Sequence, residues 1–411
     1  MMRALSLAHE AVLNCYKAYL TGESPSEIDI NAKLDEMLHI AQVHQIESMV
    51  YHVLRKTEFF KKASNETRLQ WRGIVLQRTY LQECKNKFIE SVYMAIEEAG
   101  IQAIVLKGIT LREVYGNPEY RHSSDEDIWI RAEDIMACDA ILKKHGFSCS
   151  LANTLTNTDL SAIHDIIYYN APMDMTIELQ FNPIGVDIWK RREINNEILS
   201  MRDRHTKRII GNVEYRCLDV TDNVFFVFAH MAKHFLSQGA SIRMCSDVGL
   251  LCRNYQTIID WEILRKRLEM HSLLGLFASV ITLNRNILGI DCGCPYGDEK
   301  SDIQPELLYD IMSGGAYGTY TKEREVSAVL TEYEMNKHGT VPNRKLFRCL
   351  FPDYSIMQQY HPELRERRWL LPVYWVKRLF RIAVTPAIRN RYIRGYIEGE
   401  RRTKLFRKLG I

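Results

Sequence analysis

The sequence predicts an α+β protein in which a small mixed sheet is flanked by helices, with a helical N-terminal region and a helical C-terminal half. Two observations support this prediction. Apolar residues recur at helical spacing through most of the first hundred positions and again after residue 215. Between these regions, short apolar or alternating stretches at 103–106, 125–130 and 173–181 have the length and spacing of strands.

Length and composition are those of a globular protein. The chain has 411 residues, of which 46% are hydrophobic and 26% charged. A chain of this length is expected to fold as two or three units rather than one. We place a helical N-terminal region at 1–100, the sheet-bearing core at 101–215, a helical domain at 216–340 and a basic helical tail at 341–411.

The cysteines and the apolar runs bear on the compartment. Ten cysteines are scattered without regular spacing, and Cys292 with Cys294 forms a C-x-C that lacks a second nearby pair. This pattern favours reduced thiols over a zinc site. No signal peptide and no apolar run of membrane length is visible. We therefore expect a cytoplasmic protein without a transmembrane segment, which the basic tail could hold at the periphery of a membrane.

Two long helical patterns precede the core. The first, from 30 to 54, follows the residues SPSE at 24–27, which have the form of a helix start signal. The second runs from 65 to 99 and leads into the first strand. Neither pattern carries a catalytic signature, so we interpret this region as a helical platform for the core.

The core prediction starts at residue 103. The apolar run Ala103–Leu106 is too short for a helix and predicts a buried strand. Lys107 and Gly108 interrupt this run before a helical pattern at 109–115. The order predicts a strand, a tight turn and a helix start, where free N–H groups can bind phosphate oxygens.

A second strand is predicted at 125–130. Residues two apart on a strand share a face, so Asp125 and Asp127 point the same way, with α-carbons roughly 6.5 Å apart. Two carboxylates on one rigid strand can hold Mg²⁺ or Mn²⁺ ions that bridge the phosphates of a nucleotide. Arg121 and Ser123 lie just upstream, where they can contact the same phosphates.

This stretch resembles a known signature. The order Lys107-Gly108, then R-x-S-x-D-x-D at 121–127, is similar to that of the nucleotidyltransferase superfamily, whose best-known member is DNA polymerase β. It is most similar to bacterial families with Lys-Gly in place of Gly-Ser, namely the uncharacterised nucleotidyltransferase family and the abortive-infection toxin nucleotidyltransferases. The motif match is specific over residues 103–130, and weaker similarity to the first family runs through most of the chain.

A further strand pattern follows the aspartates. Residues 132–145 have a helical pattern that ends at Gly146, and 147–151 predict a short strand. From 173 to 181, apolar residues alternate with polar ones, which predicts a strand with Glu178 on its polar face. The resemblance implies a third carboxylate on a neighbouring strand, and we assign Glu178 to that position.

Two positions depart from the family. Glu126 stands between the aspartates, where the family usually has an apolar residue facing the core. Because an unpaired buried charge is costly, we expect Glu126 either to reach a sheet edge or to pair with a cation. The family also has a histidine two residues after the third carboxylate, and this chain has Gln180 there.

The pattern from 222 to 254 is helical. His230 and His234 stand four apart, as do Arg243 and Asp247, so each pair shares a helix face. The sequence HMAKH lacks the glutamate of a zinc-protease motif. The histidines therefore either form hydrogen bonds in the core or line the nucleotide or acceptor cleft. The resemblance extends from His230 to Trp261 and implies a helical domain packed over the core.

Two later segments predict loops. Residues 288–302 are rich in Gly, Cys and Pro and mark a boundary between units. The glycine-rich 313–318 follows a helical pattern instead of a strand, so it predicts a loop and no phosphate-binding turn. The sequence contains no Walker-type or dinucleotide-binding glycine motif.

The tail is basic and the rest of the chain is acidic. Residues 344–411 contain 17 Lys and Arg against 5 Asp and Glu, a net charge of +12, and the remainder carries −9. Such basic helices with an apolar face can bind RNA backbone or an anionic membrane surface. The alternative is that the apolar face packs on the body. The aromatic residues interleaved with the arginines are Trp369, Tyr374, Trp375, Phe380, Tyr392, Tyr396 and Phe406.

The resemblance implies a function for the core. It implies a nucleotidyltransferase that moves a nucleoside monophosphate from a nucleoside triphosphate to an acceptor and releases pyrophosphate. The acceptor is left open between RNA, a protein and a small molecule. The alternative is a non-catalytic nucleotide-binding or scaffold protein with a degenerate site. In the catalytic reading, Asp125, Asp127 and Glu178 hold two Mg²⁺ (or Mn²⁺) ions, and Lys107, Gly108, Arg121 and Ser123 hold the triphosphate.

Overall fold

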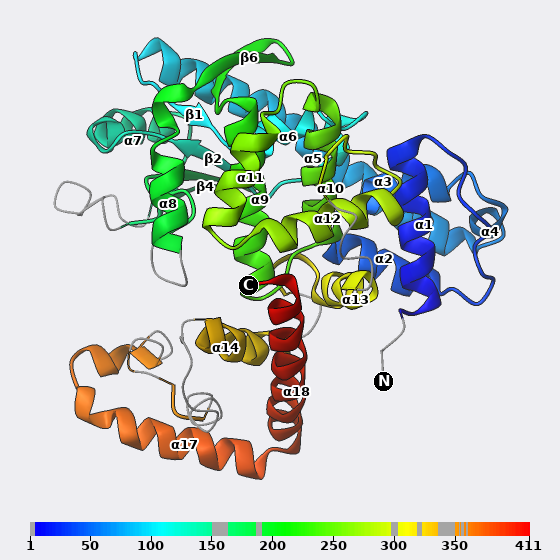
Figure 1. Cartoon of the computed structure of the whole chain (residues 1–411), viewed down its shortest axis with the longest axis vertical. Coiled ribbons are helices and arrows are strands. Elements are labelled where there is room, and N and C mark those ends of the chain that lie inside the picture. Colours follow the sequence, from blue (N-terminus) through cyan, green and yellow to red (C-terminus); the bar gives the residue numbers. More distant parts are fainter. Residues whose placement is uncertain are drawn as a thin grey trace.

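The computed structural model describes residues 5–149, 163–185, 191–296, 303–318, 323–335 and 361–411, together with 350–352, 354, 357 and 358. In this part of the chain the strands form one mixed sheet of seven strands in the order β3-β4-β5-β2-β1-β7-β6, and helices surround it (Figure 1). The predicted α+β fold class is confirmed. The division of the chain into four units stays a prediction.

The sheet contains the four predicted strands, as β1, β2, β3 and β5, together with β4 and a hairpin that the sequence analysis did not identify. The strand β2 pairs in parallel with β5 and antiparallel with β1, which itself pairs in parallel with β7. The hairpin β6–β7 extends the sheet beyond β1. The strand bounds are β1 Ile104–Val105, β2 Asp125–Trp129, β3 Ser148–Cys149, β4 Asp165–Asn170, β5 Met175–Gln180, β6 Thr206–Ile210 and β7 Val213–Cys217.

Alternate residues of β2 face two different hydrophobic cores. Ile128 and Ile130 pack in a core formed with the helices α5 (Asn65–Glu98) and α7 (Ile135–Lys144). Trp129 packs in the other, larger core on the opposite face of the sheet. Since residues two apart share a face, Asp125 and Asp127 point to the side of the larger core, and Glu126 points to the side of α5 and α7.

The N-terminal region is helical, but the predicted helix from 30 to 54 is wrong in its extent. It is divided into α2 (Leu34–Val43) and α3 (Glu47–Leu54), because Gln45 takes a left-handed backbone conformation with φ of 57°. The SPSE residues 24–27 lie in the loop before α2 and start no helix. The other helices here are α1 Leu7–Thr21, α4 Glu58–Lys61 and the predicted long α5.

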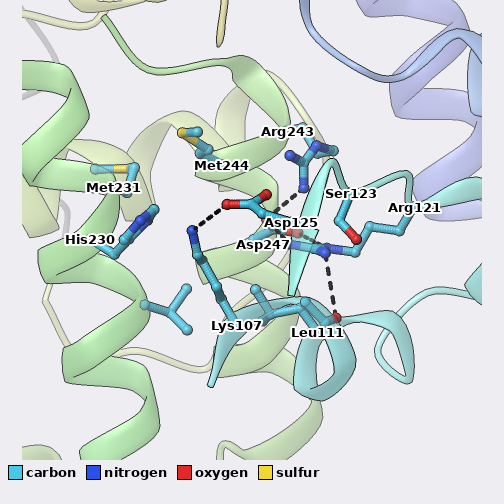
Figure 2. A pocket seen from close by; sticks show the side chains of 12 residues that line it. Lys107, Leu111, Arg121, Ser123, Asp125, His230, Met231, Arg243, Met244 and Asp247 are labelled. Atoms are coloured by element: carbon cyan, nitrogen blue, oxygen red, sulfur yellow. Dashed lines mark hydrogen bonds and ion pairs between the residues drawn. The ribbon is translucent and has the colours of Figure 1, made fainter. Parts of the chain in front are cut away.

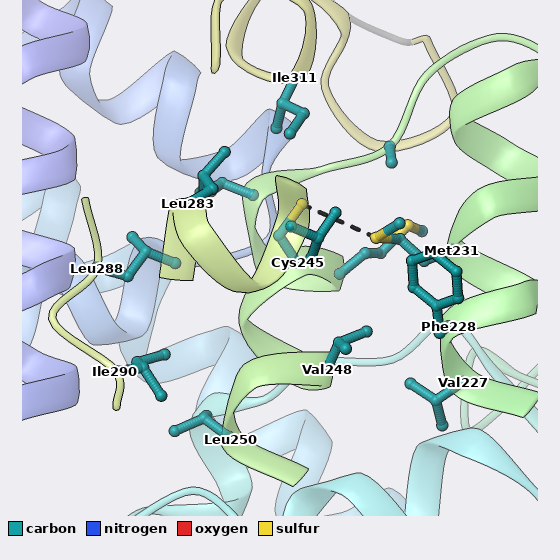
Figure 3. Packing of buried hydrophobic residues seen from close by; sticks show 14 of the residues in the cluster. Val227, Phe228, Met231, Cys245, Val248, Leu250, Leu283, Leu288, Ile290 and Ile311 are labelled. Atoms are coloured by element: carbon teal, nitrogen blue, oxygen red, sulfur yellow. Dashed lines mark hydrogen bonds between the residues drawn. The ribbon is translucent and has the colours of Figure 1, made fainter. Parts of the chain in front are cut away.

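The C-terminal half packs with the N-terminal helices in the larger core. Figure 3 shows α9, α10, α12 and α13 meeting around Phe228, Cys245 and Leu283. The helical pattern at 222–254 is divided into two helices by a turn at 237–241. The helix bounds are α8 Arg191–Leu199, α9 Val220–Leu236, α10 Ile242–Tyr255, α11 Trp261–Met270, α12 Leu274–Asn286, α13 Gln304–Gly314 and α14 Glu323–Met335.

The remaining predicted loops and cysteines agree with the structure where it describes them. The segment 287–296 is a loop, and residues 297–302 of the predicted loop lie outside the described residues. The glycine-rich 313–318 ends α13 and forms a short 3₁₀ turn, with no strand before it. No disulfide is seen among the described cysteines, and Cys292 and Cys294 are buried.

The described part of the tail forms two helices, α17 (Leu371–Val384) and α18 (Pro386–Leu409). The end of α18 packs in the larger core, where the rings of Phe235 and Phe406 lie 5.3 Å apart. In Figure 1, α18 leads away from the body and α17 lies at its far end. Among the described helices, none has the length and apolar character needed to cross a bilayer.

Candidate active site

Three carboxylates converge on one face of the sheet. Asp125 and Asp127 come from β2 and Glu178 from β5. The parallel pairing places Asp127 directly opposite Glu178 and Asp125 opposite Thr176. As a result, one carboxylate oxygen from each of the three acids lies within 4.8 Å of the others. We call these three residues the sheet-edge carboxylates.

Lys107 and Gln180 partly balance the sheet-edge carboxylates. Lys107 Nζ lies 3.3 Å from Asp125 Oδ2 and 3.2 Å from Asp127 Oδ2. Gln180 Nε2 donates to Asp127 Oδ1 at 2.8 Å and to Glu178 Oε2 at 3.0 Å. Three acids therefore share one ion-paired lysine and one amide. Asp127 Oδ2 is buried and accepts no hydrogen bond in the described structure, although Lys107 is near it.

The three acids differ in their affinity for a proton. Burial alone would raise the pKa of Asp125, but Lys107 and a hydrogen bond from Ser124 lower it to about 2. Burial raises the pKa of Asp127, and the charge of Asp125 adds to the effect against the opposing effect of Lys107. Burial, followed by repulsion from Asp127 and Asp125, raises the pKa of Glu178. Without a further cation, the site favours a bound proton.

Hard oxygen ligands of this kind suit a divalent cation. Mg²⁺ and Mn²⁺ prefer carboxylate oxygens, and nucleotide-binding sites commonly hold them through one or two carboxylates plus phosphates. The excess of negative charge and the convergence of three carboxylate oxygens within 4.8 Å fit such an ion. The residues present therefore match the group that the sequence analysis expected.

Gly108 allows the tight turn between β1 and the helix α6 (Lys107–Arg112). Its φ of 40° and ψ of −91° lie outside the range of ordinary L residues. A Cβ atom at this position would lie 2.4 Å from Glu126 Oε2. A residue without a side chain is therefore needed for the turn that points Lys107 at the aspartates.

Glu126 resolves one departure from the family by pairing with a cation. Its buried carboxylate forms an ion pair with Arg112, whose guanidinium also donates to the Ser123 hydroxyl. Ser123 Oγ in turn donates to Glu126 Oε1 at 2.8 Å. The charge of Glu126 is thus satisfied on the face away from the aspartates. The sequence did not identify Arg112, because nothing in the residues around it indicates that it contacts Glu126.

Arg121 joins the core to α10. Its Nε and Nη2 atoms both donate to the Asp247 carboxylate at 2.9 Å, and Nη1 donates to Gly108 O at 3.4 Å. Asp247 also accepts from Arg243 Nη1 at 3.2 Å and from the Tyr115 hydroxyl at 2.8 Å. Arg243 and Asp247 share a helix face as predicted and form an ion pair. Arg121 binds the same Asp247 carboxylate through two further hydrogen bonds. A triphosphate role for Arg121 stays a prediction.

Two hollows open beside Lys107. The smaller has a volume of about 30 Å³ and lies between the Lys-Gly turn and the helices α9 and α10 (Figure 2). This is the share of liquid volume of one water molecule. Its lining includes Lys107, Gly108, Arg121, Ser123, Asp125, His230, Arg243 and Asp247.

The larger hollow is a cleft of about 390 Å³, within the range of small-molecule sites. The sheet-edge carboxylates lie on its floor. Ser124 also lines it, and its hydroxyl donates to Asp125 Oδ1 at 2.9 Å. The structure therefore directs Ser124 into the cleft, while the Ser123 hydroxyl is held by Arg112 and Glu126. In the sequence, the one indication that Ser124 faces the cleft is that it is adjacent to Ser123.

The rest of the cleft lining comes from α9 and from the start of β4, the strand beside β5. His230 and His234 line the cleft with their Nε2 atoms 3.2 Å apart. Lys233 also lines it, with Nζ 2.8 Å from His164 Nε2. Burial, with Lys107 nearby, holds the pKa of His230 well below its usual value. The histidines line the cleft and also form a hydrogen bond with each other, so elements of both predicted roles are observed. Lys233 was missed, although it lies within the HMAKH segment.

The fold and the site define the class of protein. A mixed sheet whose parallel strands bring three carboxylates beside a Lys-Gly turn, under a helical half that closes a cleft, is the arrangement of a nucleotidyltransferase. The family described as "Uncharacterised nucleotidyltransferase" matches residues 31–289, and the chain belongs to that family. No curated protein and no solved structure matches it.

Proposed function

We propose that the protein is a metal-dependent nucleotidyltransferase that moves a nucleoside monophosphate from a nucleoside triphosphate to an acceptor and releases pyrophosphate. The convergence of Asp125, Asp127 and Glu178 within 4.8 Å supports this more than any other observation. The family assignment supports the transferase class. A closer relation to abortive-infection toxin nucleotidyltransferases is part of the proposal.

The sheet-edge carboxylates would hold Mg²⁺ or Mn²⁺. A bound divalent cation supplies neutralisation of the phosphate charge in such a reaction. Asp125, whose pKa is lowered to about 2, stays ionised at neutral pH and offers a permanent ligand. Asp127 and Glu178 would release any bound proton when the cation enters, because its charge favours the ionised carboxylates.

The triphosphate would bind in the larger cleft. Its volume admits a nucleotide, whereas the smaller hollow would have to widen first. Lys107 on the floor and Lys233 on α9 supply positive charge to the phosphates, and Ser124 offers a hydroxyl donor. In this arrangement Gly108 shapes the turn, and Arg121 donates to its carbonyl oxygen. The triphosphate contacts expected of Arg121 and Ser123 remain part of the proposal.

The chemical step is an in-line displacement at the α-phosphorus. An acceptor hydroxyl oxygen forms the new O–P bond while the bond to the pyrophosphate oxygen breaks. Glu178, the third carboxylate, would lie near the acceptor hydroxyl and accept its proton. Positioning and charge neutralisation supply most of the catalysis. The acceptor, whether RNA, a protein or a small molecule, is to be found by screening labelled nucleotides against each class.

The central experiment is a melting curve with and without metal and nucleotide. Wild type should gain stability with Mg²⁺ or Mn²⁺ and at least one of the four ribonucleoside triphosphates, since a ligand that binds only the folded state stabilises it. Asp125→Asn/Asp127→Asn should lose this gain and all turnover. Without ligand, the same variant should melt at or above the wild-type temperature, because repulsion is relieved.

A matched control replaces two exposed acids that lie away from the cleft. Glu133→Gln/Asp203→Asn removes the same number of charges and should keep the full metal-dependent gain. If wild type shows no metal-dependent gain with any triphosphate, the nucleotidyltransferase proposal fails. If it binds nucleotide but turns none over with any acceptor class, the protein is a non-catalytic nucleotide-binding or scaffold protein. Two departures from the family, Glu126 and Gln180, favour this alternative. The pairing of Glu126 with Arg112 accounts for the first of them.

A further inference from the structure

Helix α17 carries an apolar stripe that faces solvent. Val373, Val376, Phe380 and Val384 follow one another at intervals of three or four residues, so they share one side of the helix. Their exposed fractions are 43%, 66%, 67% and 57%. Trp369, just before the helix, is 71% exposed. We call these five residues the α17 stripe. Monomeric soluble proteins rarely leave such a contiguous apolar surface uncovered.

The opposite side of α17 is already engaged, so the stripe is a second apolar side. Trp375 Nε1 donates to Pro352 O at 3.0 Å, and its ring makes an edge contact with Phe351 at 5.5 Å. Arg378 donates to the hydroxyl of Tyr392 on α18. These contacts fix the rotation of the helix about its axis and direct the stripe away from the chain. The alternative considered from the sequence, that the apolar face of the tail packs on the body, is seen at the end of α18 but not for the α17 stripe.

The charge of the chain around the α17 stripe has one sign. Residues 367–397 contain eight Lys and Arg and no Asp or Glu, although Glu363, which lies outside this stretch, accepts a hydrogen bond from Tyr374 on α17. Lys377 and Arg381 are exposed along one edge of the stripe, and Arg389 and Arg394 are exposed on α18. An apolar stripe bordered by cations is complementary to a surface that is apolar within and anionic at its boundary.

We propose that α17 docks on the anionic surface of a lipid bilayer, with its stripe in the acyl boundary and its cations at the headgroups. The helix of 14 residues is roughly 21 Å long, so it lies along the interface and does not span it. Trp369 takes the position that tryptophan favours at a membrane boundary. Valine side chains neither stack on bases nor form hydrogen bonds, so the stripe suits a bilayer better than RNA. Figure 1 shows α17 at the far end of α18, where the body leaves room for a flat surface. This proposal does not depend on nucleotide transfer.

The test uses the full-length protein and sedimented vesicles. Wild type should bind vesicles of equal parts phosphatidylcholine and phosphatidylglycerol, and added salt should weaken binding. Vesicles of phosphatidylcholine alone should bind about tenfold more weakly or not at all. Val376→Ser/Phe380→Ser should reduce binding to the anionic vesicles at least about tenfold. Lys377→Gln/Arg381→Gln should also weaken it and reduce its salt dependence.

Two matched controls separate this effect from general changes in the surface. Ile209→Ser/Ile258→Ser removes two apolar residues that are similarly exposed on the body. Lys87→Gln/Lys266→Gln removes two exposed cations far from α17. Both variants should bind anionic vesicles like wild type. Brominated lipid should quench the fluorescence of wild type bound to anionic vesicles, and Trp369→Phe should lose most of that quenching.

Three outcomes would overturn the proposal. One is full-length protein that ignores the anionic vesicles at low salt. Another is binding that Val376→Ser/Phe380→Ser leaves unchanged, because the stripe would then contribute nothing. The third is single-stranded RNA binding that the stripe and charge variants both abolish while vesicles are ignored, which would make α17 a nucleic-acid surface. Circular dichroism of each variant should match wild type, since every substituted side chain is exposed.

Discussion

Two clusters of charged side chains in this protein are built in opposite ways. The sheet-edge carboxylates set three acids against one ion-paired lysine at the floor of a cleft. The second, which we call the Asp310 cluster, ties α18 to α9, α13 and α14. Arg324 Nη1 lies 3.1 Å from Asp310 Oδ2, and Arg401 Nη2 lies 2.7 Å from Glu398 Oε1. Its members are Asp310, Glu398, Arg324, Arg401 and Arg402.

The net charge of a cluster, more than its number of acids, distinguishes a binding site from an ion-pair cluster that holds helices together. The Asp310 cluster has one more arginine than acids, but Arg402 also donates to the carbonyl oxygens of Phe235 and Ser237 at the end of α9. Both acids of this cluster are therefore paired with arginines, although Arg402 Nε, 3.4 Å from Asp310 Oδ1, makes no hydrogen bond. The sheet-edge carboxylates instead have an excess of negative charge, since Lys107 is the one lysine ion-paired with them in the described part of the chain. A fold tolerates such a cluster where an external cation completes it.

The largest expected effect comes from breaking the Asp310 cluster. Asp310→Ala should destabilise the fold by about 3–5 kcal/mol, because it leaves the buried guanidinium groups of Arg324 and Arg402 without their shared carboxylate. Urea unfolding of the variant beside wild type measures this loss. Asp127→Asn is the matched comparison at the other cluster and should cost nothing in metal-free buffer. Equal losses from both variants would remove the distinction between the clusters.

A smaller loss is expected from Gly108→Ala. The new Cβ atom would collide with Glu126 Oε2, in a carboxylate that Arg112 and Ser123 hold through Oε1, and φ would remain positive. We expect a loss of about 2 kcal/mol in unfolding free energy, together with weaker metal-dependent stabilisation as Lys107 shifts. Gly73→Ala is the control, since an added Cβ there meets no atom within 4 Å. In the middle of α5 it should stabilise by roughly 0.5–1 kcal/mol. A Gly108→Ala variant as stable as wild type would mean that the turn relaxes freely.

The two clusters should respond to pH with opposite signs. In metal-free protein, the pKa values of Asp127 and Glu178 are raised. At a pH above the usual carboxyl pKa of about 4, the folded state therefore binds more protons than the unfolded state. Their contribution to stability is therefore lost as pH rises from about 4 to 8, by up to about 1.4 kcal/mol per pH unit for each proton. The pKa of Asp310 is held well below its usual value by Arg324, Arg402 and Arg401 against the opposing effect of burial. Its contribution is present above pH 4 and is lost in acid.

Unfolding free energies measured in chelator across this range check both signs. Glu178→Gln should flatten the decline between pH 5 and 8 and leave the acid limb unchanged. Excess Mg²⁺ should reverse the decline in wild type, because the cation competes with protons for the carboxylates. The buried histidines His44, His122 and His230 have lowered pKa values and oppose the decline, so the test is the difference between wild type and Glu178→Gln, from which they cancel. Equal slopes for the two proteins between pH 5 and 8 in chelator would show that Glu178 is no more basic in the folded state.

The sequence predicted the part of the site that depends on local pattern. The periodicity of two placed Asp125 and Asp127 on one face, and the alternation at 173–181 placed Glu178 on the polar face of a strand, as observed. Which strands are neighbours, and in which register, depends on tertiary pairing. The resemblance supplied the neighbouring strand, and the structure supplied the register of Asp127 with Glu178. Partners far apart in sequence, such as Arg121 with Asp247, have no local signal.

The smallest predicted effect concerns Gln180, where the family has a histidine. One amide nitrogen donates to both Asp127 and Glu178, so it screens the repulsion between them. Gln180→Met keeps the size and removes the donor, and it should cost about 1 kcal/mol in metal-free protein. Gln180→His offers a ring N–H in the same place and should recover part of that loss.

Measurements in saturating Mg²⁺ show whether Gln180 screens charge or only packs. If the amide stands in for part of a missing cation, the difference between Gln180→Met and wild type should shrink when the carboxylates bind metal, since the ion then separates their charges. Chemical unfolding of the three proteins in chelator and in excess Mg²⁺ gives the comparison directly. A loss that stays the same in both buffers would assign Gln180 to packing alone. The departure from the family histidine would then have no bearing on how the sheet-edge carboxylates are held.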